Sequence, residues 1–347
     1  MDARVVPLTL ELREPLHAAH GTTTVRDLLL LRVESDQGVV GWGEAAPLAS
    51  YDGVALSDCR AALEAQAAAL RAVTPGSGGA AALDAARAAA DLPQALAAVD
   101  LALWDAAAQR EGVPVASLLS GDPAAQVLVN ATIAAADRAG AAAQAGAARA
   151  AGFDCLKLKV GLGDDAGRVA AVRAAAGPRM LLRLDANGAW SVDEAVAAIG
   201  ALEGAGLELV EEPVHGVAEL RAVRERVATR IAMDETAALH GAISSGAADA
   251  VCLKLGRAGG IAALLAQATL VRTTGAEPYL ASTLDGPLGI AAAVHAAAAL
   301  RIEPACGMAT LAMFRAGMPD ALAPVGGAIA LPAGPGLGVD PAALFGL

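Results

Sequence analysis

The chain has 347 residues, a formal net charge of -12, 56% hydrophobic residues and only 2% aromatic residues. This length allows either two domains or one large barrel with an appendage. The acidic balance and the lack of a basic run argue against a nucleic-acid partner, because such binding depends on neutralising phosphates. No apolar run approaches the roughly 20 residues of a membrane span, and the first residues lack a leader pattern. We therefore expect a cytoplasmic protein with no membrane partner.

The four cysteines lie far apart in the chain and form no C-x-x-C pair: Cys59, Cys155, Cys252 and Cys306. Structural zinc sites and disulfide frameworks usually show closer or paired spacings. We expect free, buried thiols.

The first 120 residues predict an α+β unit. Residues 1–50 contain three strand-like segments, VVPLTLEL, DLLLLRVES and VVGWGE, with a turn at residues 36–38 before the last. Residues 56–120 are rich in Ala, Leu, Arg and Glu at helical spacing, interrupted by the PGSGG loop at 75–79.

From about residue 126 the pattern changes to short apolar segments that alternate with Ala-rich helical stretches. One helix start is marked by Ser191 and Glu194, which have the spacing of a capping box. Such βα repeats give a parallel sheet. The strand candidates are VLVNATI, CLKLKV, LLRLDA, LELVEE, RIAMDE, AVCLKL, PYLAS and RIEPA.

Polar residues near the ends of five of these strands recur at intervals of 26, 26, 23 and 20 residues: Lys159, Asp185, Glu211, Asp234 and Lys254. A steady repeat favours a (β/α) barrel, whose strand ends converge on one mouth, over a doubly wound sheet with one switch point. We therefore expect an α/β fold of modified (β/α) TIM type.

Lysine is scarce in this chain and concentrated at these strand ends. Of the 25 lysines and arginines only three are lysines, namely Lys157, Lys159 and Lys254. Lys157 and Lys159 share one face of their strand, which in a barrel is the interior. The alternative is a strand end whose lysines reach solvent. Because lysine, unlike arginine, can lose its proton when buried near positive charge, we predict that one of them acts as a base.

Three carboxylates end the next three strands: Asp185, Glu211 and Asp234. Each has an ordinary alternative, since Asp185 could form an Asx-turn and the other two could cap helices. Together they form an oxygen-ligand set that suits Mg²⁺, with Mn²⁺ as an alternative. Lys254 would then face the far side of a metal-held carboxylate substrate and stabilise the enediolate formed by loss of its α-proton.

These motifs resemble the enolase superfamily, and within it the muconate lactonizing enzyme subgroup. The matching elements are KLK at 157–159, DAN at 185–187, EEP at 211–213, DE at 234–235, Lys254 with GRAGG, and GWGE at 41–44. The resemblance implies an N-terminal α+β capping domain at 1–122, with the tail 320–347 returning to it, and a modified barrel at 123–319. It also implies a lid between His17 and Thr24.

Within the subgroup, four segments look most like ortho-succinylbenzoate synthases of menaquinone biosynthesis: VNATI, APL, STLDGPLG and ACGMATLAMF. The resemblance implies dehydration of 2-succinyl-6-hydroxy-2,4-cyclohexadiene-1-carboxylate. Lys159 would be the base, Lys254 the stabilising cation, and Lys157 would orient the carboxylate and lower the pKa of Lys159. Further residues expected near the metal or substrate are Asn187, Glu235, His20, Ser282 and Asp285.

Other chemistries of the subgroup stay open: N-succinylamino acid racemase, dipeptide epimerase and muconate-type cycloisomerase. The expected last strand, RIEPACG, lacks the Asp-x-Asp that holds a dipeptide amine in related epimerases, which disfavours that reaction. A non-catalytic barrel that only binds a metabolite is disfavoured because no lysine or ligand is missing. The small-molecule partner is a carboxylate, and the Ala-rich surfaces are compatible with a homo-oligomer.

Overall fold

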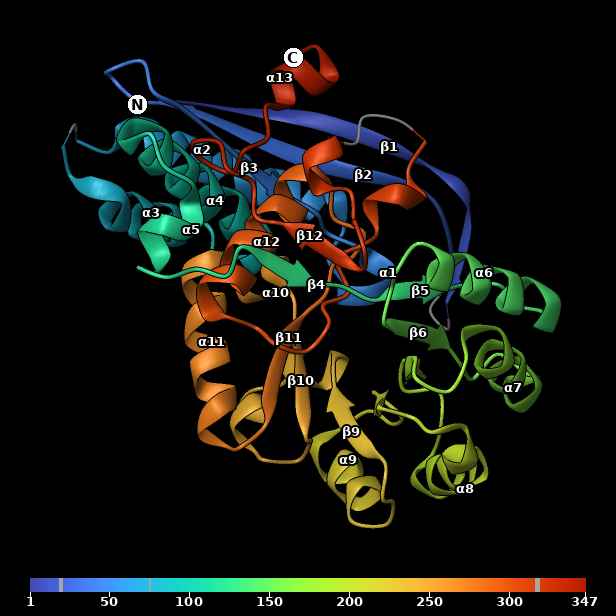
Figure 1. Cartoon of the computed structure of the whole chain (residues 1–347). Helices are drawn as coiled ribbons and strands as arrows, with labels where there is room; N and C mark the ends of the chain where they lie inside the picture. The colour runs from blue at the N-terminus through green and yellow to red at the C-terminus, as the bar shows by residue number, and fades with distance from the viewer. Residues whose placement is uncertain (19–20, 75, 316–318) are drawn as a thin grey trace.

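The computed structural model describes residues 1–18, 21–74, 76–315 and 319–347. Within these residues there are three sheets: a three-stranded antiparallel sheet, a seven-stranded parallel sheet and a two-stranded pair. In Figure 1 the N-terminal sheet, in blue, lies above the parallel sheet, which runs from green to orange. The expected combination of a TIM-type α/β barrel and an N-terminal cap is confirmed.

The N-terminal unit is a sheet followed by helices. β1 (Asp2–Ala18) pairs antiparallel with β2 (Gly21–Glu34), which pairs with β3 (Val40–Ala45). The helices that follow are α1 (Ala49–Asp52), α2 (Leu56–Ala72), α3 (Gly78–Ala89), α4 (Pro93–Glu111) and α5 (Val115–Leu119). A hydrophobic cluster of small residues fills the space between the sheet and helices α2 to α4.

The GWGE segment in β3 brings three parts of the chain together. A Cβ at Gly43 would collide with the backbone carbonyl of Ala98, so the glycine is what allows α4 to pack directly on the strand. The backbone N–H of Trp42 donates to Asp105 Oδ2 at 2.8 Å, and Asp105 Oδ1 accepts from the N–H of Leu337 at 2.8 Å. This segment therefore ties the sheet to α4 and to the C-terminal tail.

The parallel sheet has the strand order β11-β10-β9-β8-β7-β6-β5, so that strands consecutive in the chain are neighbours. This consecutive order is that of a (β/α) barrel. In a doubly wound sheet the strand order changes direction at the switch point. Its strands are β5 (Ala131–Ile133), β6 (Cys155–Lys159), β7 (Leu181–Asp185), β8 (Leu209–Glu211), β9 (Arg230–Met233), β10 (Ala250–Leu253) and β11 (Glu277–Leu280). The intervening and following helices are α6 (Arg138–Ala150), α7 (Asp165–Ala176), α8 (Val192–Leu202), α9 (Val217–Arg224), α10 (Leu255–Ala258), α11 (Ile261–Thr273) and α12 (Pro287–Leu300). The predicted capping box at the start of α8 is present.

The expected last barrel strand, RIEPACG, is reduced to two isolated parallel bridges at its end, Cys306 with Val129 and Gly307 with Ala281, and residues 301–305 form no strand. The proline of that segment has no N–H to donate. The sheet edges are joined just after it: the N–H of Cys306 donates to the carbonyl of Leu128, and that of Gly307 to Leu280, both at 2.8 Å. The barrel is thus closed by a short bridging segment.

The segment VLVNATI is divided between two sheets instead of forming one strand. Its first half is β4 (Gln126–Leu128), which pairs antiparallel with β12 (Ala328–Ala330) from the tail, and its second half is β5. Further on, the tail contacts the start of α5, where the N–H of Val115 donates to the carbonyl of Gly336 at 2.9 Å. The chain ends with α13 (Pro341–Phe345), which Figure 1 shows near the N-terminal sheet. The boundary near residue 122 stays a prediction.

Small aliphatic residues make up most of the barrel core, and α12 is buried along nearly all of its length. All four cysteines are free and buried, as the sequence indicates. A search of the described residues finds no helix with the length and apolar character needed to cross a membrane.

Candidate active site

The three lysines and the three predicted metal ligands meet at one mouth of the barrel. They lie at the carboxyl ends of five successive strands: Lys157 and Lys159 in β6, Asp185 in β7, Glu211 in β8, Asp234 directly after β9 and Lys254 directly after β10. The strands are parallel, so these ends lie on the same side of the sheet. All of these side chains except Lys159 are buried.

The two lysines of β6 both point toward the carboxylates. Lys157 Nζ lies between Asp185 Oδ2, at 2.8 Å, and Glu211 Oε1, at 2.7 Å. Lys159 Nζ contacts Asp185 Oδ2 at 2.6 Å and Asn187 Oδ1 at 2.8 Å. The prediction that these two lysines share the interior face is confirmed, and the alternative of a solvated strand end is excluded.

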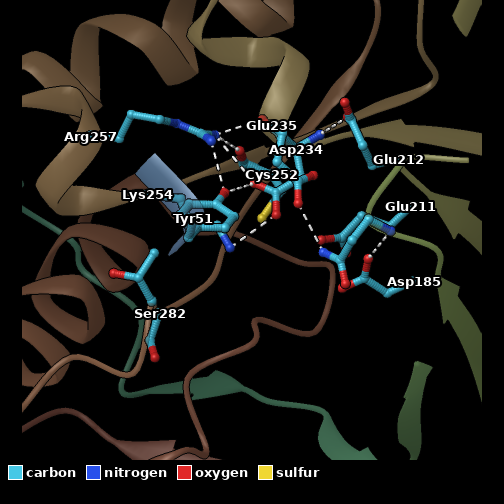
Figure 2. A network of polar contacts seen from close by, with 12 residues as sticks. Tyr51, Asp185, Glu211, Glu212, Asp234, Glu235, Cys252, Lys254, Arg257 and Ser282 are labelled. Carbon is cyan, nitrogen blue, oxygen red and sulfur yellow. Dashed lines mark hydrogen bonds and ion pairs between the residues drawn. The ribbon is translucent and has the colours of Figure 1, made fainter. Parts of the chain in front are cut away.

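Lys254 lies on the other side of the carboxylate cluster. Its Nζ contacts Asp234 Oδ2 at 3.0 Å, and the ring of Tyr51 covers it at 5.0 Å from Nζ to the ring centroid. Figure 2 shows Lys254 and Tyr51 on one side of Asp234, with Glu211 and Asp185 on the opposite side. Three strands, β7 to β9, separate Lys159 from Lys254 in the sheet order.

The carboxylates are not electrostatically equivalent. Burial alone would raise the pKa of Asp185, but the Lys157 and Lys159 ammonium groups outweigh it and hold that pKa below its usual range. The pKa of Asp234 is likewise lowered, because Lys254 and Arg257 outweigh its burial. The pKa of Glu211 is raised, mainly by burial and also by the two neighbouring carboxylates. A cation bound among the three would stabilise their ionised forms.

The pKa values of Lys157 and Lys254 are set by the carboxylates beside them. Burial works to lower the pKa of Lys157, yet Asp185 and Glu211 more than offset it, so this pKa is raised. Lys254 behaves in the same way, because Asp234 outweighs the effect of its burial. The neighbouring carboxylates therefore favour the ammonium form of both side chains. A lysine in this cluster can become neutral only when another cation interacts with these carboxylates in its place.

Asn187 and Glu235 form a support behind Lys159. Asn187 Nδ2 donates to Glu235 Oε1 at 2.9 Å, and this orients the amide so that its oxygen accepts from Lys159. The backbone N–H of Asn187 donates to Asp185 Oδ1 at 3.1 Å, so the Asx-turn considered as an alternative is present alongside the lysine contacts. Asn187 has a φ of 46°, which costs conformational energy in a non-glycine residue.

Glu212 holds the backbone of the next loop. Its Oε2 accepts from the N–H of Asp234 at 2.7 Å, and its Oε1 from the N–H of Thr236 at 2.9 Å. His215 Nδ1 lies 3.0 Å from the same Oε1. Glu212 itself has a φ of 40°, so the strained backbone is concentrated around the predicted ligands.

Of the other predicted site residues, one lines the pocket, one does not, and one lies outside the described residues. Ser282 lines the pocket and its Oγ lies 2.8 Å from Thr310 Oγ1. Asp285 is buried next to Glu44 and accepts from Thr283 Oγ1 at 2.8 Å, and it is not among the described residues that line the pocket. His20 lies outside the described residues.

Both tyrosines of the chain contact a predicted metal ligand, which the sequence analysis missed. Tyr51 OH donates to Asp234 Oδ1 at 2.8 Å, and Tyr279 OH donates to Glu211 Oε2 at 2.7 Å. Arg257 was missed as well, and it contacts Asp234 Oδ1 at 3.2 Å. The available signal was scarcity, because the chain contains only two tyrosines, just as it contains few lysines.

The donor set fits a hard divalent cation. Asp185, Glu211 and Asp234 present carboxylate oxygens that are almost fully inaccessible to solvent, and Glu235 Oε2, next to Asp234, has no hydrogen-bond partner among the described residues. Candidate ligand atoms of Glu211, Asp234 and Cys252 lie within 4.8 Å of one another, and burial raises the pKa of the Cys252 thiol well above its usual range. Oxygen-only ligation is what Mg²⁺ prefers.

The cluster opens into a pocket between the barrel and the N-terminal unit. The N-terminal unit supplies apolar and hydroxyl side chains, and the barrel supplies mainly hydroxyl and small groups in addition to the charged cluster. The described lining consists of Leu16, Thr23, Leu48, Tyr51, Thr132, Lys157, Lys159, Asp185, Asn187, Asp234, Lys254, Ala281, Ser282, Thr283, Leu284, Gly307, Thr310 and Met313.

Two family models match the chain. The model "Mandelate racemase / muconate lactonizing enzyme, N-terminal domain" matches residues 1–120, and "Enolase C-terminal domain-like" matches residues 140–343. The chain belongs to the enolase superfamily, in its muconate lactonizing enzyme subgroup. The resemblance inferred from the lysines and carboxylates is thereby confirmed.

Relatives in this superfamily have different reactions. The chain is 33% identical to the hydrophobic dipeptide epimerase of Enterococcus faecalis, over 97% of this chain and 96% of that protein. It is 40% identical to the o-succinylbenzoate synthase of Mycobacterium tuberculosis, over 59% of this chain and 64% of that protein. A crystal structure of the dipeptide epimerase from Enterococcus faecalis, complexed with Mg and the dipeptide L-Leu-L-Tyr, has a TM-score of 0.88 at 29% identity and covers 97% of this chain and 98% of that one. The chain is thus an enolase-superfamily enzyme, and membership alone leaves its substrate open.

Proposed function

We propose that this enzyme binds Mg²⁺ through Asp185, Glu211 and Asp234 and removes a proton next to the carboxylate of a small acid. We further propose that the acid is 2-succinyl-6-hydroxy-2,4-cyclohexadiene-1-carboxylate, which the enzyme dehydrates to ortho-succinylbenzoate. The observation that carries the proposal is the placement of two lysines on opposite sides of three buried carboxylates, Lys159 beside Asp185 and Lys254 beside Asp234.

Each residue has a role that follows from its position. The bound Mg²⁺ supplies positive charge that stabilises the negative charge developing on the substrate carboxylate. Lys159, on the more open side of the cluster, takes the proton from the substrate α-carbon. Lys254 stays protonated and stabilises the enediolate from the opposite side. Lys157 lies between two carboxylates and orients the substrate carboxylate.

The dehydration then needs no further residue. The C–H bond at C1, the α-carbon, breaks and its proton moves to Lys159, while the electron pair enters the enediolate. This pair then forms the new C1–C6 double bond as the C–O bond between C6 and the hydroxyl group breaks. Lys159 returns the same proton to the departing hydroxide, so that one water leaves and the ring becomes aromatic. One base on one face is sufficient for both proton transfers.

The lining of the pocket supports this substrate over a dipeptide. Among the described lining residues the only acids are Asp185 and Asp234, and both belong to the metal cluster. The free ammonium group of a dipeptide would therefore be buried without a carboxylate partner, which is costly. The higher identity to the o-succinylbenzoate synthase, over the part that it covers, supports the same choice.

Two alternatives have specific support. Dipeptide epimerization is supported by the similarity along the whole chain to the Enterococcus faecalis enzyme. N-Succinylamino acid racemization is supported by the two opposed lysines, because a racemase can use one lysine on each face. A muconate-type cycloisomerase remains the third alternative within the subgroup.

A substrate panel tests the proposal. Purified enzyme with Mg²⁺ is mixed separately with the cyclohexadiene substrate, N-succinyl amino acids, Ala-Glu dipeptides and muconate. We expect rapid aromatisation of the cyclohexadiene substrate, which is measured by the change in its ultraviolet absorbance. Rapid racemisation or epimerisation without aromatisation would refute the proposed substrate.

The role of Lys159 is tested by Lys159→Ala and Lys159→Arg. Both variants should fold, as judged by circular dichroism, and both should lose turnover. Arginine keeps the positive charge but cannot give up its proton, so Lys159→Arg separates the base from the cation. An active Lys159→Ala enzyme would show that another group removes the proton.

A further inference from the structure

Tyr51 enters the barrel mouth from the N-terminal unit. It lies in α1, and the adjacent Asp52 fastens this turn to the unit: Asp52 Oδ1 accepts from the N–H of Val54 at 2.9 Å, and its Oδ2 accepts from Gln94 Nε2 at 3.0 Å. The place of Tyr51 is thus set by the N-terminal unit, and its side chain meets residues of the barrel.

The hydroxyl of Tyr51 joins two barrel residues. It donates to Asp234 Oδ1 at 2.8 Å and accepts from Arg257 Nη1 at 2.8 Å. Arg257 Nη2 in turn donates to the backbone carbonyl of Asp234 at 2.7 Å, and Figure 2 shows this set of contacts around Asp234. One carboxylate oxygen, Oδ1, is thereby engaged, while Oδ2 faces Lys254.

The ring of Tyr51 acts on a second group. Lys254 Nζ lies 5.0 Å from its centroid and Arg257 Cζ lies 5.8 Å from it, both within the range of cation–π attraction. Lys254 is only 7% exposed, so water screens this attraction little. An aromatic ring stabilises a lysine in its charged form at this position.

We propose that Tyr51 is a positioning residue through which the N-terminal unit arranges the barrel mouth, with its hydroxyl orienting the Asp234 carboxylate and its ring holding Lys254 in place. The inference rests on the proposed function, because it takes Asp234 as a metal ligand and Lys254 as the stabilising cation. The same unit lines the pocket through Leu48, so the packing of this segment couples substrate enclosure to the arrangement of the metal site.

Two variants separate the hydroxyl from the ring. Tyr51→Phe keeps the ring and removes both hydroxyl contacts, and Tyr51→Leu removes the ring as well. Outer partners of metal ligands typically change metal affinity by about 10- to 100-fold, so the Mg²⁺ Kd of both variants should rise by about that factor in calorimetry without substrate. At saturating Mg²⁺, Tyr51→Leu should have a kcat roughly 2- to 30-fold below that of Tyr51→Phe, the factor expected for one cation–π contact, with similar KM.

Phe153→Leu serves as the matched control, because Phe153 is a half-buried aromatic residue packed on the barrel core. It should lower thermal stability and leave the Mg²⁺ Kd unchanged. An unchanged or lower Kd in Tyr51→Phe would overturn the role of the hydroxyl, and equal kcat values in the two variants would overturn the role of the ring.

The two proposals fail in different ways. If the wild-type enzyme binds Mg²⁺ and turns over none of the candidate acids, the proposed substrate is wrong while the Kd ratio still decides the role of Tyr51. If the wild-type enzyme does not bind Mg²⁺, both proposals are wrong.

Discussion

Lys157→Met removes the ammonium group that lies between two buried carboxylates. In the folded chain Lys157 Nζ contacts Asp185 Oδ2 and Glu211 Oε1 at 2.8 and 2.7 Å, and both acids are completely buried. Methionine is unbranched and similar in length, so it fills the space without a large cavity. What the substitution changes is therefore mainly the charge.

The expected loss of stability follows from these contacts. Removing one partner of a buried ion pair typically costs about 3–5 kcal/mol, because the charge left behind stays buried. Asp185 keeps its contact with Lys159 and Glu211 keeps the hydroxyl of Tyr279, so a value near 3 kcal/mol is expected, at the low end of that rough range. If Glu211 takes up a proton instead, the cost is about 1.4 kcal/mol for each unit by which the pH exceeds the pKa of this carboxyl in the unfolded chain.

Urea unfolding in EDTA and in excess Mg²⁺, followed by circular dichroism, measures this effect. Lys157→Met should be much less stable than wild type in EDTA, and Mg²⁺ should reduce the difference, because the bound cation neutralises the same carboxylates. Arg226→Met is the control: it breaks an exposed ion pair with Asp193 and should hardly move the urea midpoint. Wild-type stability of Lys157→Met in EDTA would refute the reasoning, and so would a difference that widens with Mg²⁺.

Two further predictions concern the N-terminal unit and the helices. Burial, together with the Asp285 carboxylate, raises the pKa of Glu44 from 4.5 to about 7, so the unfolded chain loses this proton first as the pH rises. The contribution of Glu44 to the free energy of unfolding should thus fall by about 3 kcal/mol between pH 4.5 and 7. Urea unfolding at pH 5 and pH 7.5 should show this fall in the wild type and not in Glu44→Gln. Equal pH dependence in the wild type and the variant would contradict the assignment. Gly43→Ala should strongly destabilise the folded chain, because the new Cβ would collide with the Ala98 carbonyl. Gly146→Ala, in open space within α6, should raise the free energy of unfolding by at most about 1 kcal/mol. Thermal melts compare the two, and a tolerated Gly43→Ala would contradict the close packing.

Part of the site follows from chain order alone. In a parallel barrel every strand end reaches the same mouth, so residues such as Lys159 and Asp185 are brought together once the repeat is recognised. The scarcity of lysine added a second signal, because all three lysines of a chain that otherwise uses arginine lie at this mouth. The sequence pattern was also sufficient to predict the strands β6 to β11 and the start of α8.

Other features required the three-dimensional structure. The last barrel strand, expected over RIEPACG, proved to be only the bridges at Cys306 and Gly307, because two isolated backbone pairs leave no periodic pattern that would mark their extent. The charge of Lys157 and Lys254 also requires the structure, because which effect decides their pKa depends on distances to carboxylates that no spacing in the sequence provides.

The amino-acid sequence by itself determined the superfamily, the barrel, and the identity of the lysines and carboxylates, because local pattern and chain order carry that information. Only the tertiary structure decided which distant side chains support them. Tyr51 lies 183 residues from Asp234, and Tyr279 lies 68 residues from Glu211. Such contacts exist only because the N-terminal unit packs over the barrel mouth and the barrel interior brings opposite strands together.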